Sequence, residues 1–244
     1  MLKQRLDKVI VERGLASSRE RARAMIMEGK VHVGGVPAAK AGSMVAADVP
    51  VEVRGREMKY VSRGGLKLES AIVNFQVVVD GKISMDVGAS TGGFTDCLLQ
   101  RGAIKVYCID VGYGQFAWKL RQDQRVHLME RTNMRYLEKV KIPDPIALAT
   151  VDVSFISLVK VVPKVLEFLQ PGGELIALIK PQFEVGKGRV EKGGVIRDAS
   201  RREQAVGNVK DALESLGLNT VGIMESPVTG QKGNIEYLVY MIKK

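Results

Sequence analysis

A glycine-rich turn between an apolar run and a helix-forming segment constrains the fold of this chain more than any other feature. The run from Ile83 to Val87 is typical of a buried strand, and the turn that follows has glycine at positions 88, 92 and 93. A helix is predicted from Phe94 to Leu99. Strand, glycine turn and helix open the βαβ unit of nucleotide-binding folds, because glycine lets a ligand approach the backbone closely. A turn that only joins a strand to a helix is the simpler alternative.

A second acidic residue supports a ribose-binding site beside this turn. Asp86 lies at the end of the first strand-like run, and Asp110 ends the next one. In βαβ folds, an acid at the tip of the second strand accepts hydrogen bonds from a ribose diol. Three residues separate Gly88 from Gly92, so the turn lacks the G-x-G-x-x-G spacing of dinucleotide sites. The pattern therefore favours a ribose-bearing cofactor without the pyrophosphate of a dinucleotide.

Alternating strands and helices predict a parallel sheet with helices on both faces. The later strand-like runs are nearly continuous in apolar residues, as expected for buried parallel strands. They span residues 126–129, 146–152, 174–180, 221–224 and 237–242. Helices are predicted over 66–74, 158–169 and 200–216, and a loop over 181–197. The carboxyl ends of parallel strands meet at one edge of a sheet, which would bring together Asp86, Asp110, Asp152 and Lys180.

The positive charge of the chain is concentrated near its N-terminus. The formal net charge is +10, and residues 1–60 carry 12 Lys and Arg against 7 Asp and Glu, which is half of that excess. A basic small domain beside a cofactor domain favours an acidic macromolecule, most simply nucleic acid, as the partner. A lysine-rich solvated surface is the alternative that charge alone always allows.

The composition disfavours several classes of protein. No apolar run is long enough to span a membrane, and the first residues lack the apolar core of a signal peptide. His32 and His127 lie far apart without clustered cysteines, so no metal site is expected. Cys97 and Cys108 fall in apolar segments and are expected to be buried free thiols. We therefore expect a cytoplasmic protein that does not insert into membranes, while the sequence indicates no oligomeric state.

The first sixty residues predict a small domain of two helices and short strands. The helical spacing of Leu6, Val9 and Ile10 ends at Gly14, and a second helix ends at Gly29. Short strands are predicted over 30–33 and 49–53. Basic side chains on and after the second helix would suit phosphate groups, and they are Arg19, Arg21, Arg23 and Lys30.

Several motifs in this segment carry a resemblance. They are Arg5-Leu-Asp7, Gly14-Leu-Ala-Ser-Ser-Arg19, Ala22, Ile26, Gly29-Lys-Val-His-Val33 and Asp48. Together they resemble the S4 RNA-binding domain over about residues 3–57. Gly34 stands where that family usually has asparagine, a departure that leaves the expected fold unchanged. We expect RNA contacts from Arg5, Arg19, Arg21, Arg23 and Lys30, and in the rest of the chain from Arg63, Lys187 and Arg189.

Charged residues at the predicted strand ends suggest a catalytic cluster. Lys67 precedes the first strand of the sheet, whereas Asp152, Lys180 and Glu236 lie at the ends or beginnings of later strands. A lysine that ends a buried strand needs a carboxylate partner, because an unpaired buried charge is costly. A structural ion pair is the alternative. Two lysines and two acids beside a ribose-type cofactor site favour catalysis.

Four motifs carry a second resemblance, which extends over almost the whole chain. They are Ser62-Arg-Gly-Gly-Leu-Lys67, Asp86-Val-Gly-Ala-Ser-Thr-Gly-Gly-Phe94, Asp152-Val-Ser-Phe155 and Lys180-Pro-Gln-Phe-Glu184. After an S4 domain, these motifs are similar to the TlyA family of FtsJ-type ribose 2′-O-methyltransferases. The resemblance implies an α/β, Rossmann-like class I methyltransferase fold with a mostly parallel seven-stranded sheet, plus a small N-terminal α+β S4 RNA-binding domain. It implies domains over 1–57 and 62–244, with a linker at 58–61.

The same resemblance implies a cofactor and a set of site residues. The cofactor would be S-adenosyl-L-methionine, the partner ribosomal RNA in ribosomal subunits, and no metal would be needed. The catalytic K-D-K-E tetrad would be Lys67, Asp152, Lys180 and Glu236. Asp110 would hold the cofactor ribose, and Asn133 would lie near the base. The full set of cofactor-binding residues would be Asp86, Gly88, Ala89, Ser90, Thr91, Gly92, Gly93, Phe94, Asp110, Val111, Asn133 and Asp152.

Three other functions fit the sequence less well than ribose methylation does. The TlyA family is described both as haemolysin-like and as ribosomal RNA 2′-O-methyltransferases acting on cytidine. A membrane-active haemolysin is therefore one alternative, although the sequence shows no amphipathic or spanning apolar element. An RNA-binding protein with an inactive methyltransferase fold is another, which the complete tetrad disfavours. The glycine spacing disfavours the last, a nicotinamide-dependent oxidoreductase.

Overall fold

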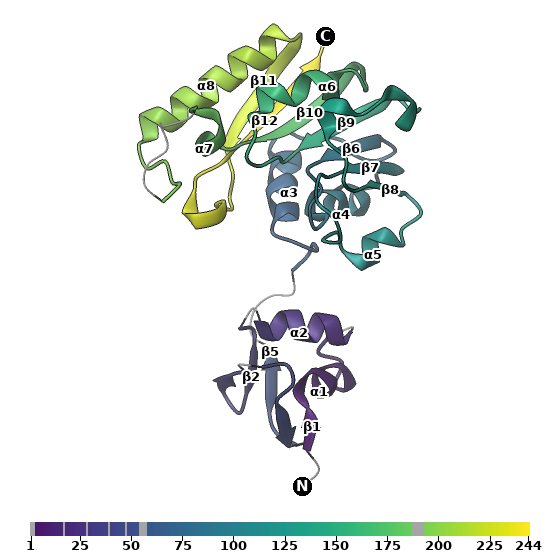
Figure 1. Ribbon diagram of the computed structural model, residues 1–244, viewed down its shortest axis with the longest axis vertical. Helices are drawn as coiled ribbons and strands as arrows, with labels where there is room; N and C mark the ends of the chain where they lie inside the picture. Colours follow the sequence, from purple (N-terminus) through teal and green to yellow (C-terminus); the bar gives the residue numbers. More distant parts are fainter. Residues whose placement is uncertain are drawn as a thin grey trace. The chain divides into compact units, whose positions relative to one another are not determined.

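The computed structural model describes residues 3–16, 18–27, 29–38, 40–46, 48–53, 58–186 and 193–244. The chain forms two compact units, Met1–Glu57 and Met58–Lys244, with separate hydrophobic cores. Figure 1 shows the elements of each unit, coloured from purple at the N-terminus to yellow at the C-terminus. The predicted linker at 58–61 instead belongs to the second unit. Tyr60 is buried in that core, and the Val61 N–H donates to Asp96 Oδ2 at 2.8 Å.

The first unit is a small α+β fold. Its elements are β1 (Lys3–Arg5), α1 (Leu6–Glu12), α2 (Arg19–Met27), β2 (Val31–Val33), β3 (Val36–Pro37), β4 (Met44–Ala46) and β5 (Val51–Val53). Strand β2 pairs antiparallel with β3 and β5, and β1 pairs with β4. The core consists of Leu6, Ile10, Ala22, Met25, Ile26 and Val31. The strands that the sequence did not predict, β1, β3 and β4, have two or three residues each, which is too short for a readable alternation.

A buried carboxylate organises the basic face of this unit. Asp7 on α1 has no exposed surface, and three arginine side chains contact it. Arg5 Nη2, Arg19 Nη2 and Arg23 Nε lie 3.0, 3.1 and 3.3 Å from Asp7 Oδ2. Hydrogen bonds from Arg5 above all, and from the two helix arginines, hold the pKa of Asp7 well below its usual range. The arginines of this Asp7 cluster remain about half exposed, so the cluster presents positive charge to solvent.

A seven-stranded sheet forms the framework of the second unit, in the order β11-β12-β10-β9-β6-β7-β8. Its strands are β6 (Ile83–Val87), β7 (Lys105–Ile109), β8 (Val126–Met129), β9 (Ile146–Val151), β10 (Leu169–Ile179), β11 (Leu218–Glu225) and β12 (Tyr237–Lys243). Strand β12 runs antiparallel to both neighbours, whereas the pairs from β10 to β8 are parallel. The predicted mostly parallel seven-stranded sheet is confirmed.

Helices cover both faces of this sheet (Figure 1). One face carries α3 (Gly64–Asn74), α4 (Gly93–Gln100) and α5 (Trp118–Arg121), and the other carries α6 (Val162–Leu166) and α8 (Ala199–Ser215). Along β7, Val106 and Cys108 face the first group, while Tyr107 and Ile109 face the second. Successive strand residues point to opposite faces, so both sets of side chains are buried. This explains why the strand sequences are continuously apolar.

The segment before β10 differs from the sequence prediction. The helix expected over 158–169 is limited to a 3-10 turn followed by α6, and β10 begins at Leu169 rather than at Glu174. The residues between them include Pro171 and two glycines, and they form an irregularity within β10, whose register with β9 shifts there. The remaining short helices are η1 (Met134–Tyr136), η2 (Lys139–Lys141), η3 (Leu158–Lys160), α7 (Pro181–Glu184) and η4 (Gln231–Gly233).

Replacing Asp7 with asparagine should destabilise the first unit. Asp7→Asn removes the negative charge that pairs with three guanidinium groups. We expect the free energy of unfolding of this unit to fall by about 2 kcal/mol at neutral pH, the scale of a hydrogen bond to a charged group. Hydrogen exchange on peptides from α1 and α2, followed by mass spectrometry of the full-length protein, measures that loss.

The same carboxylate predicts how the unit responds to acid. The folded pKa of Asp7 lies below the unfolded value of about 3.9, so its stabilisation is present above about pH 4 and is lost as the pH falls towards the folded pKa. Asp7→Asn should lack this part of the acid sensitivity. Glu12→Gln is the matched control, because it breaks only the exposed pair that Glu12 forms with Lys8 at 3.5 Å. Equal acid sensitivity in both variants would contradict the role given to Asp7.

Candidate functional site

The carboxyl ends of the parallel strands enclose a cavity at one edge of the sheet. Its volume is about 510 Å³. The lining residues follow β6, β7, β8 and β9, and they are Val87, Gly88, Ser90, Ile109, Asp110, Val111, Gly112, Gln115, Thr132, Asn133, Met134, Asp152, Val153, Ser154, Phe155, Ile156 and Val161. Parallel α/β sheets bind their ligands at this edge. Six predicted cofactor residues lie on the wall, namely Gly88, Ser90, Asp110, Val111, Asn133 and Asp152.

Gly88 allows the turn after β6 to lie against the end of β9. Its φ is +85°, and a Cβ atom there would overlap the carbonyl oxygen of Asp152. The Gly88 N–H donates to Ile109 O at 2.8 Å, and the Asp152 N–H donates to Val87 O at 2.9 Å. A side chain at position 88 would therefore force apart the strand ends that form the cavity wall.

Asp110 joins two loops at the mouth of the cavity. Its Oδ2 accepts a hydrogen bond from the Ser90 N–H at 2.6 Å, and its Oδ1 accepts one from the Gly112 N–H at 2.6 Å. A Cβ on Gly112 would lie 2.9 Å from Asp110 Oδ1, so glycine is needed for this approach. The carboxylate is thus fixed in orientation at the position where βαβ folds bind a ribose.

The other half of the predicted cofactor turn does not line the cavity that the described residues form. This half consists of Asp86, Ala89, Thr91, Gly92, Gly93 and Phe94. Gly92, with a φ of +95°, leads into α4, and a Cβ there would lie 2.5 Å from Leu120 Cδ1. Ala89 and Phe94 are buried in the core beneath α3 and α4. Gly92, Gly93 and Phe94 are buried where the chain enters α4, whereas Thr91 is partly exposed.

Asp86 is fully buried under the same turn. Its Oδ2 accepts a hydrogen bond from Thr95 Oγ1 at 2.6 Å, and its Oδ1 accepts one from Thr150 Oγ1 at 3.1 Å. Burial raises the pKa of Asp86 to about 6, while the two hydroxyl donors oppose that shift. Asp86 therefore connects α4 to β6 and β9, and its assignment as a cofactor-binding residue stays a prediction.

Sequence reasoning missed a larger share of the wall. The cavity residues it did not assign are Val87, Ile109, Gly112, Gln115, Thr132, Met134, Val153, Ser154, Phe155, Ile156 and Val161. Two groups of these residues lie in recognisable sequence motifs, the glycine-rich corner after Asp110 and the Asp152-Val-Ser-Phe155 motif, which could have indicated them. The apolar members carry no such signal, because a strand-end residue that faces a cavity has the same composition as one that faces the core.

The four residues of the predicted tetrad form two lysine–carboxylate ion pairs. Lys180 Nζ lies 2.6 Å from Asp152 Oδ1, and Lys67 Nζ lies 2.5 Å from Glu236 Oε2. The exposed fraction is 11% for each lysine side chain, 22% for Asp152 and 3% for Glu236. Ammonium groups this buried require a carboxylate partner, because desolvation of an unpaired charge is costly.

The strand register brings the two pairs to the same place. Ile179 and Tyr237 are partners in the antiparallel ladder of β10 and β12. Lys180 follows the first of these residues and Glu236 precedes the second, so the two residues lie opposite each other just beyond the ladder. Asp152 directly follows β9, the parallel neighbour of β10. A lysine and two acids from three strands thus meet at the edge that holds the cavity.

The segment before β12 fixes Glu236 from several directions. The Ser226 N–H donates to Glu236 O at 2.8 Å, and a Cβ on Gly230 would overlap the Glu236 carboxylate. Asn234, which is 4% exposed, donates from Nδ2 to Gly194 O at 2.9 Å and accepts at Oδ1 from the Ile196 N–H at 3.2 Å. Asn234 therefore attaches the chain around residues 194–196 to the segment that carries Glu236.

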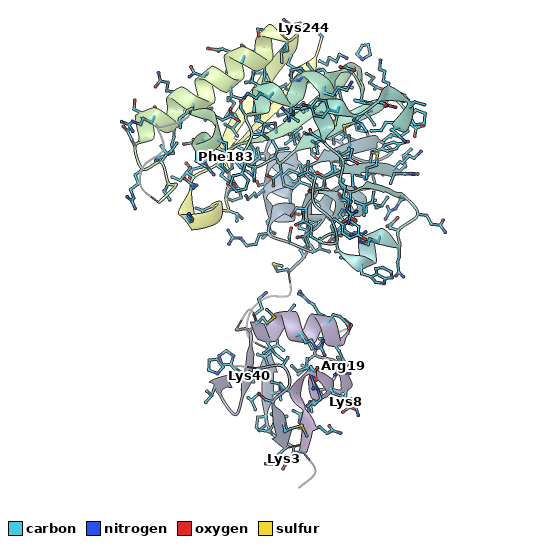
Figure 2. The ribbon with its side chains drawn as sticks, in the orientation of Figure 1. Lys3, Lys8, Arg19, Lys40, Phe183 and Lys244 are labelled. Carbon is cyan, nitrogen blue, oxygen red and sulfur yellow. The ribbon has the colours of Figure 1, made fainter. Side chains whose placement is uncertain are left out.

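The predicted RNA-binding residues are distributed over both units. The Asp7 cluster contains three of them, and Figure 2 labels Arg19 among the side chains of the first unit. Arg21 on α2 and Lys30 before β2 belong to the same unit. In the second unit, Arg63 Nη2 donates to Thr229 O at 2.6 Å. The other two predicted contacts, Lys187 and Arg189, lie outside the described residues.

Comparison with known proteins identifies the family. The profile of the FtsJ-like methyltransferases matches residues 60–243, and that of the S4 domain matches residues 4–49. The chain belongs to the FtsJ-like methyltransferase family. Its S4 domain precedes the methyltransferase domain, which is the arrangement that the sequence motifs predict.

The relatives extend over nearly the whole chain. The 16S/23S rRNA (cytidine-2′-O)-methyltransferase TlyA of Mycobacterium tuberculosis is 44% identical over 97% of this chain and 89% of its own length. Hemolysin A of Brachyspira hyodysenteriae is 44% identical over 98% and 99%. A solved structure of a Streptococcus thermophilus protein named after hemolysins covers 100% of this chain and 90% of its own, with a TM-score of 0.78 and 41% identity.

The residues of the cavity fit S-adenosylmethionine, the methyl donor of this family. Gly88 and Gly112 let the backbone lie close to Asp152 and Asp110 on the cavity wall, and the Asp110 carboxylate is oriented at the mouth. Asn133, whose Oδ1 accepts from the Arg135 N–H at 3.1 Å, lines the same wall. Within the described chain, no group of three or more His, Cys, Asp or Glu residues could hold a metal ion.

A single methyl group at Gly88 should weaken cofactor binding. In Gly88→Ala, the new Cβ displaces the carbonyl of Asp152, and the positive φ is strained for alanine. We expect the dissociation constant for S-adenosylmethionine to rise by about 10-fold or more, since the wall between β6 and β9 opens. Isothermal titration calorimetry measures this change.

Gly207→Ala is the control for this substitution. Gly207 lies within α8, and no atom would lie within 4 Å of its Cβ. Its cofactor affinity should match that of the unaltered protein, and its stability should be equal or greater by about 0.5–1 kcal/mol, because alanine favours helix. A folded Gly88→Ala protein with unchanged affinity would remove this turn from the cofactor site.

Proposed function

We propose that this chain transfers a methyl group from S-adenosylmethionine to the 2′-hydroxyl of a ribose, in cytidine nucleotides of ribosomal RNA. The observation that carries the proposal is the pair of buried lysines beside the cavity, Lys180 with Asp152 and Lys67 with Glu236. The Mycobacterium tuberculosis relative that is named for this reaction supports the choice of substrate. Action on ribosomal subunits in the cytoplasm is part of the same proposal.

Lys180 is the residue that handles the nucleophile in this proposal. Bound S-adenosylmethionine supplies a methyl group on a positively charged sulfur, which needs no further activation. The ribose 2′-hydroxyl is a weak nucleophile, so the protein has to remove its proton. Lys180 Nζ accepts that proton as the 2′-oxygen bonds to the methyl carbon and the carbon–sulfur bond breaks. Asp152, 2.6 Å from this nitrogen, stabilises the ammonium that results.

The second pair and the cavity wall supply orientation. Lys67, held by Glu236, places a positive charge at the same edge, where negative charge develops on the 2′-oxygen. Asp110 holds the cofactor ribose through a carboxylate that two backbone N–H groups already orient. Holding both reactants in line reduces the entropy that the reaction has to lose, and this contributes much of the rate.

The first unit supplies affinity for RNA. Its Asp7 cluster presents three partly exposed guanidinium groups, which suit phosphate oxygens. The S4 profile covers the same helices, and the S4 domain is an RNA-binding module. We infer that this unit binds ribosomal RNA and increases the local concentration of substrate at the cavity.

Membrane lysis is the second candidate, because a 44% identical relative carries the name Hemolysin A. Among the described residues, the helices lack the combination of length and apolar character needed to cross a bilayer. Incubation of purified protein with red cells, with and without S-adenosylmethionine, separates the two functions. Release of haemoglobin at micromolar protein, together with absence of methyl transfer to ribosomal RNA, would favour lysis.

Substitution of Lys180 tests the catalytic assignment. Lys180→Ala should abolish methyl transfer while it leaves the affinities for S-adenosylmethionine and RNA within about twofold, because the lysine acts mainly in the transition state. Lys180→Arg should be almost as inactive, since a guanidinium group stays protonated. Single-turnover methylation of ribosomal RNA measures both rates, and mapping of ribose methylation identifies the nucleotide.

Thermal melts of the same variants distinguish a structural ion pair. If Lys180 only neutralises Asp152, Lys180→Ala should lower the melting temperature and Lys180→Arg should restore both stability and activity. A stable Lys180→Arg protein with a near-normal methylation rate would exclude proton transfer to Lys180. Lys105→Ala serves as the control, because it breaks a comparable pair with Asp144, at 2.6 Å, away from the cavity.

The helix arginines of the Asp7 cluster should contribute salt-dependent RNA affinity. Changing Arg19 and Arg23 together to glutamine should weaken binding and reduce the slope of log K against log salt by about 1 to 2, roughly one unit per lost phosphate contact. Fluorescence anisotropy with a ribosomal RNA fragment, at several salt concentrations, measures the slope. Arg125→Gln is the control, since Arg125 pairs with Asp123 at 2.8 Å in the second unit. An unaltered slope in the double variant would show that these arginines do not contact phosphate.

A further inference from the structure

Ser154 is an exposed residue that contacts a buried lysine. Its hydroxyl oxygen accepts a hydrogen bond from Lys180 Nζ at 2.8 Å, and it lines the cavity close to Asp152. We propose that Ser154 is a positioning residue, which directs the nitrogen of Lys180 towards the ribose 2′-hydroxyl. This inference rests on the proposed function and extends it, because the four residues of the tetrad leave the direction of that nitrogen undetermined.

The tetrahedral geometry of a lysine nitrogen explains this role. Besides its bond to Cε, the nitrogen has three positions for hydrogen atoms or a lone pair. Ser154 Oγ accepts a hydrogen bond at one of these positions, at 2.8 Å, whereas Asp152 Oδ1, 2.6 Å away, attracts the nitrogen by charge and is not aligned as a hydrogen-bond acceptor. This hydrogen bond fixes the rotation about the bond between Cε and the nitrogen, and with it the directions of the other two positions, one of which is the lone pair in the neutral amine. With Asp152 alone, the nitrogen would rotate about its bond to Cε, and the lone pair would meet the 2′-hydroxyl only part of the time.

The backbone next to Ser154 is held in an uncommon conformation. Phe155 has a φ of +63°, in the left-handed region that bulky residues rarely adopt. Its side chain is 87% exposed, so the conformation gains little apolar burial. This conformation directs the two neighbouring side chains to different partners. The Ser154 hydroxyl contacts Lys180, and the ring centroid of Phe155 lies 5.0 Å from that of Phe183. Backbone strain without gained burial is typical of functional sites.

Further contacts fix this loop to the segment that carries the lysine. The Leu158 N–H donates to Glu184 Oε1 at 2.9 Å. Glu184 is the last residue of α7, the short helix that begins directly after Lys180. Burial of Glu184 raises the pKa of its carboxyl group, while hydrogen bonds from the Ser157 side chain and from the Leu158 N–H oppose the shift. The loop is thus attached at three points: Ser154 bonds Lys180, and Phe155 and Leu158 contact residues of α7. Ser154 can hold the amine in one place because its own position is fixed.

Removal of the hydroxyl tests the inference. In Ser154→Ala, the single-turnover methylation rate should fall by about 10- to 100-fold, the scale of a misdirected reacting group. The KM for ribosomal RNA and the dissociation constant for S-adenosylmethionine should stay within about twofold, since the group acts on Lys180 and on neither ligand. The residue is exposed, so the melting temperature should not change. Ser154→Thr keeps the hydroxyl and should restore most of the rate.

Ser157→Ala is the matched control within the same loop. Ser157 Oγ accepts from the Val159 N–H at 3.3 Å at the start of η3 and interacts with Glu184 rather than with Lys180, so Ser157→Ala disturbs the loop without removing a contact of the lysine. A normal rate in Ser154→Ala would overturn the inference, and so would equal losses in Ser154→Ala and Ser157→Ala, which would indicate loop disturbance. Failure of Ser154→Thr to exceed the alanine variant would also overturn it. Failure of the unaltered protein to methylate any ribose would instead refute the proposed function itself, so the two failures are distinguishable.

Discussion

Burial of two ammonium groups at one edge of a sheet is the constraint on which the second unit depends. An ammonium group removed from water needs a carboxylate beside it, and the two lysine side chains here are each 11% exposed. One of the required carboxylates comes from far along the chain, since Lys67 and Glu236 are 169 residues apart. The antiparallel strand β12, placed between β10 and β11, is what brings Glu236 to the cavity edge. The departure of the sheet from a fully parallel order therefore has a direct chemical consequence.

Glycine occupies positions at this edge of the sheet where chain segments approach one another closely. Gly88 lets the turn after β6 contact the end of β9, and Gly230 makes room for the carboxylate of Glu236. Both glycines permit segments that carry a charged residue of the site to approach another part of the backbone closely. Asn234 adds a buried amide that joins a further segment to the same cluster. The edge of the sheet is thus assembled from five or more chain segments whose approach depends on small or amide side chains.

The sequence predicted where the charged residues of the site lie better than it predicted the cavity wall. Strand ends, the tetrad and Asp110 could be placed because charged residues that end apolar runs are conspicuous, and parallel strands bring their ends together. The orientation of the glycine turn could not be predicted, because Ala89, Gly92 and Phe94 face the core only once α4 begins at Gly93. The helix expected over 158–169 failed for a related reason. Its apolar spacing also suits a short helix followed by an irregular strand, and only the pairing of Leu169 with Ile146 decides between them.

The Asp7 cluster has a consequence for the thermodynamics of any phosphate that meets it. A free arginine on a surface samples many rotamers, and binding has to immobilise it at a cost of about 0.5–1.5 kcal/mol per side chain. In this unit, Asp7 already restricts three guanidinium groups to within 3.0–3.3 Å of one oxygen. The arginine side chains therefore lose this conformational entropy when the unit folds, and not when it binds a phosphate. The cluster should therefore bind a polyanion with a smaller entropic penalty than three independent arginines of equal charge.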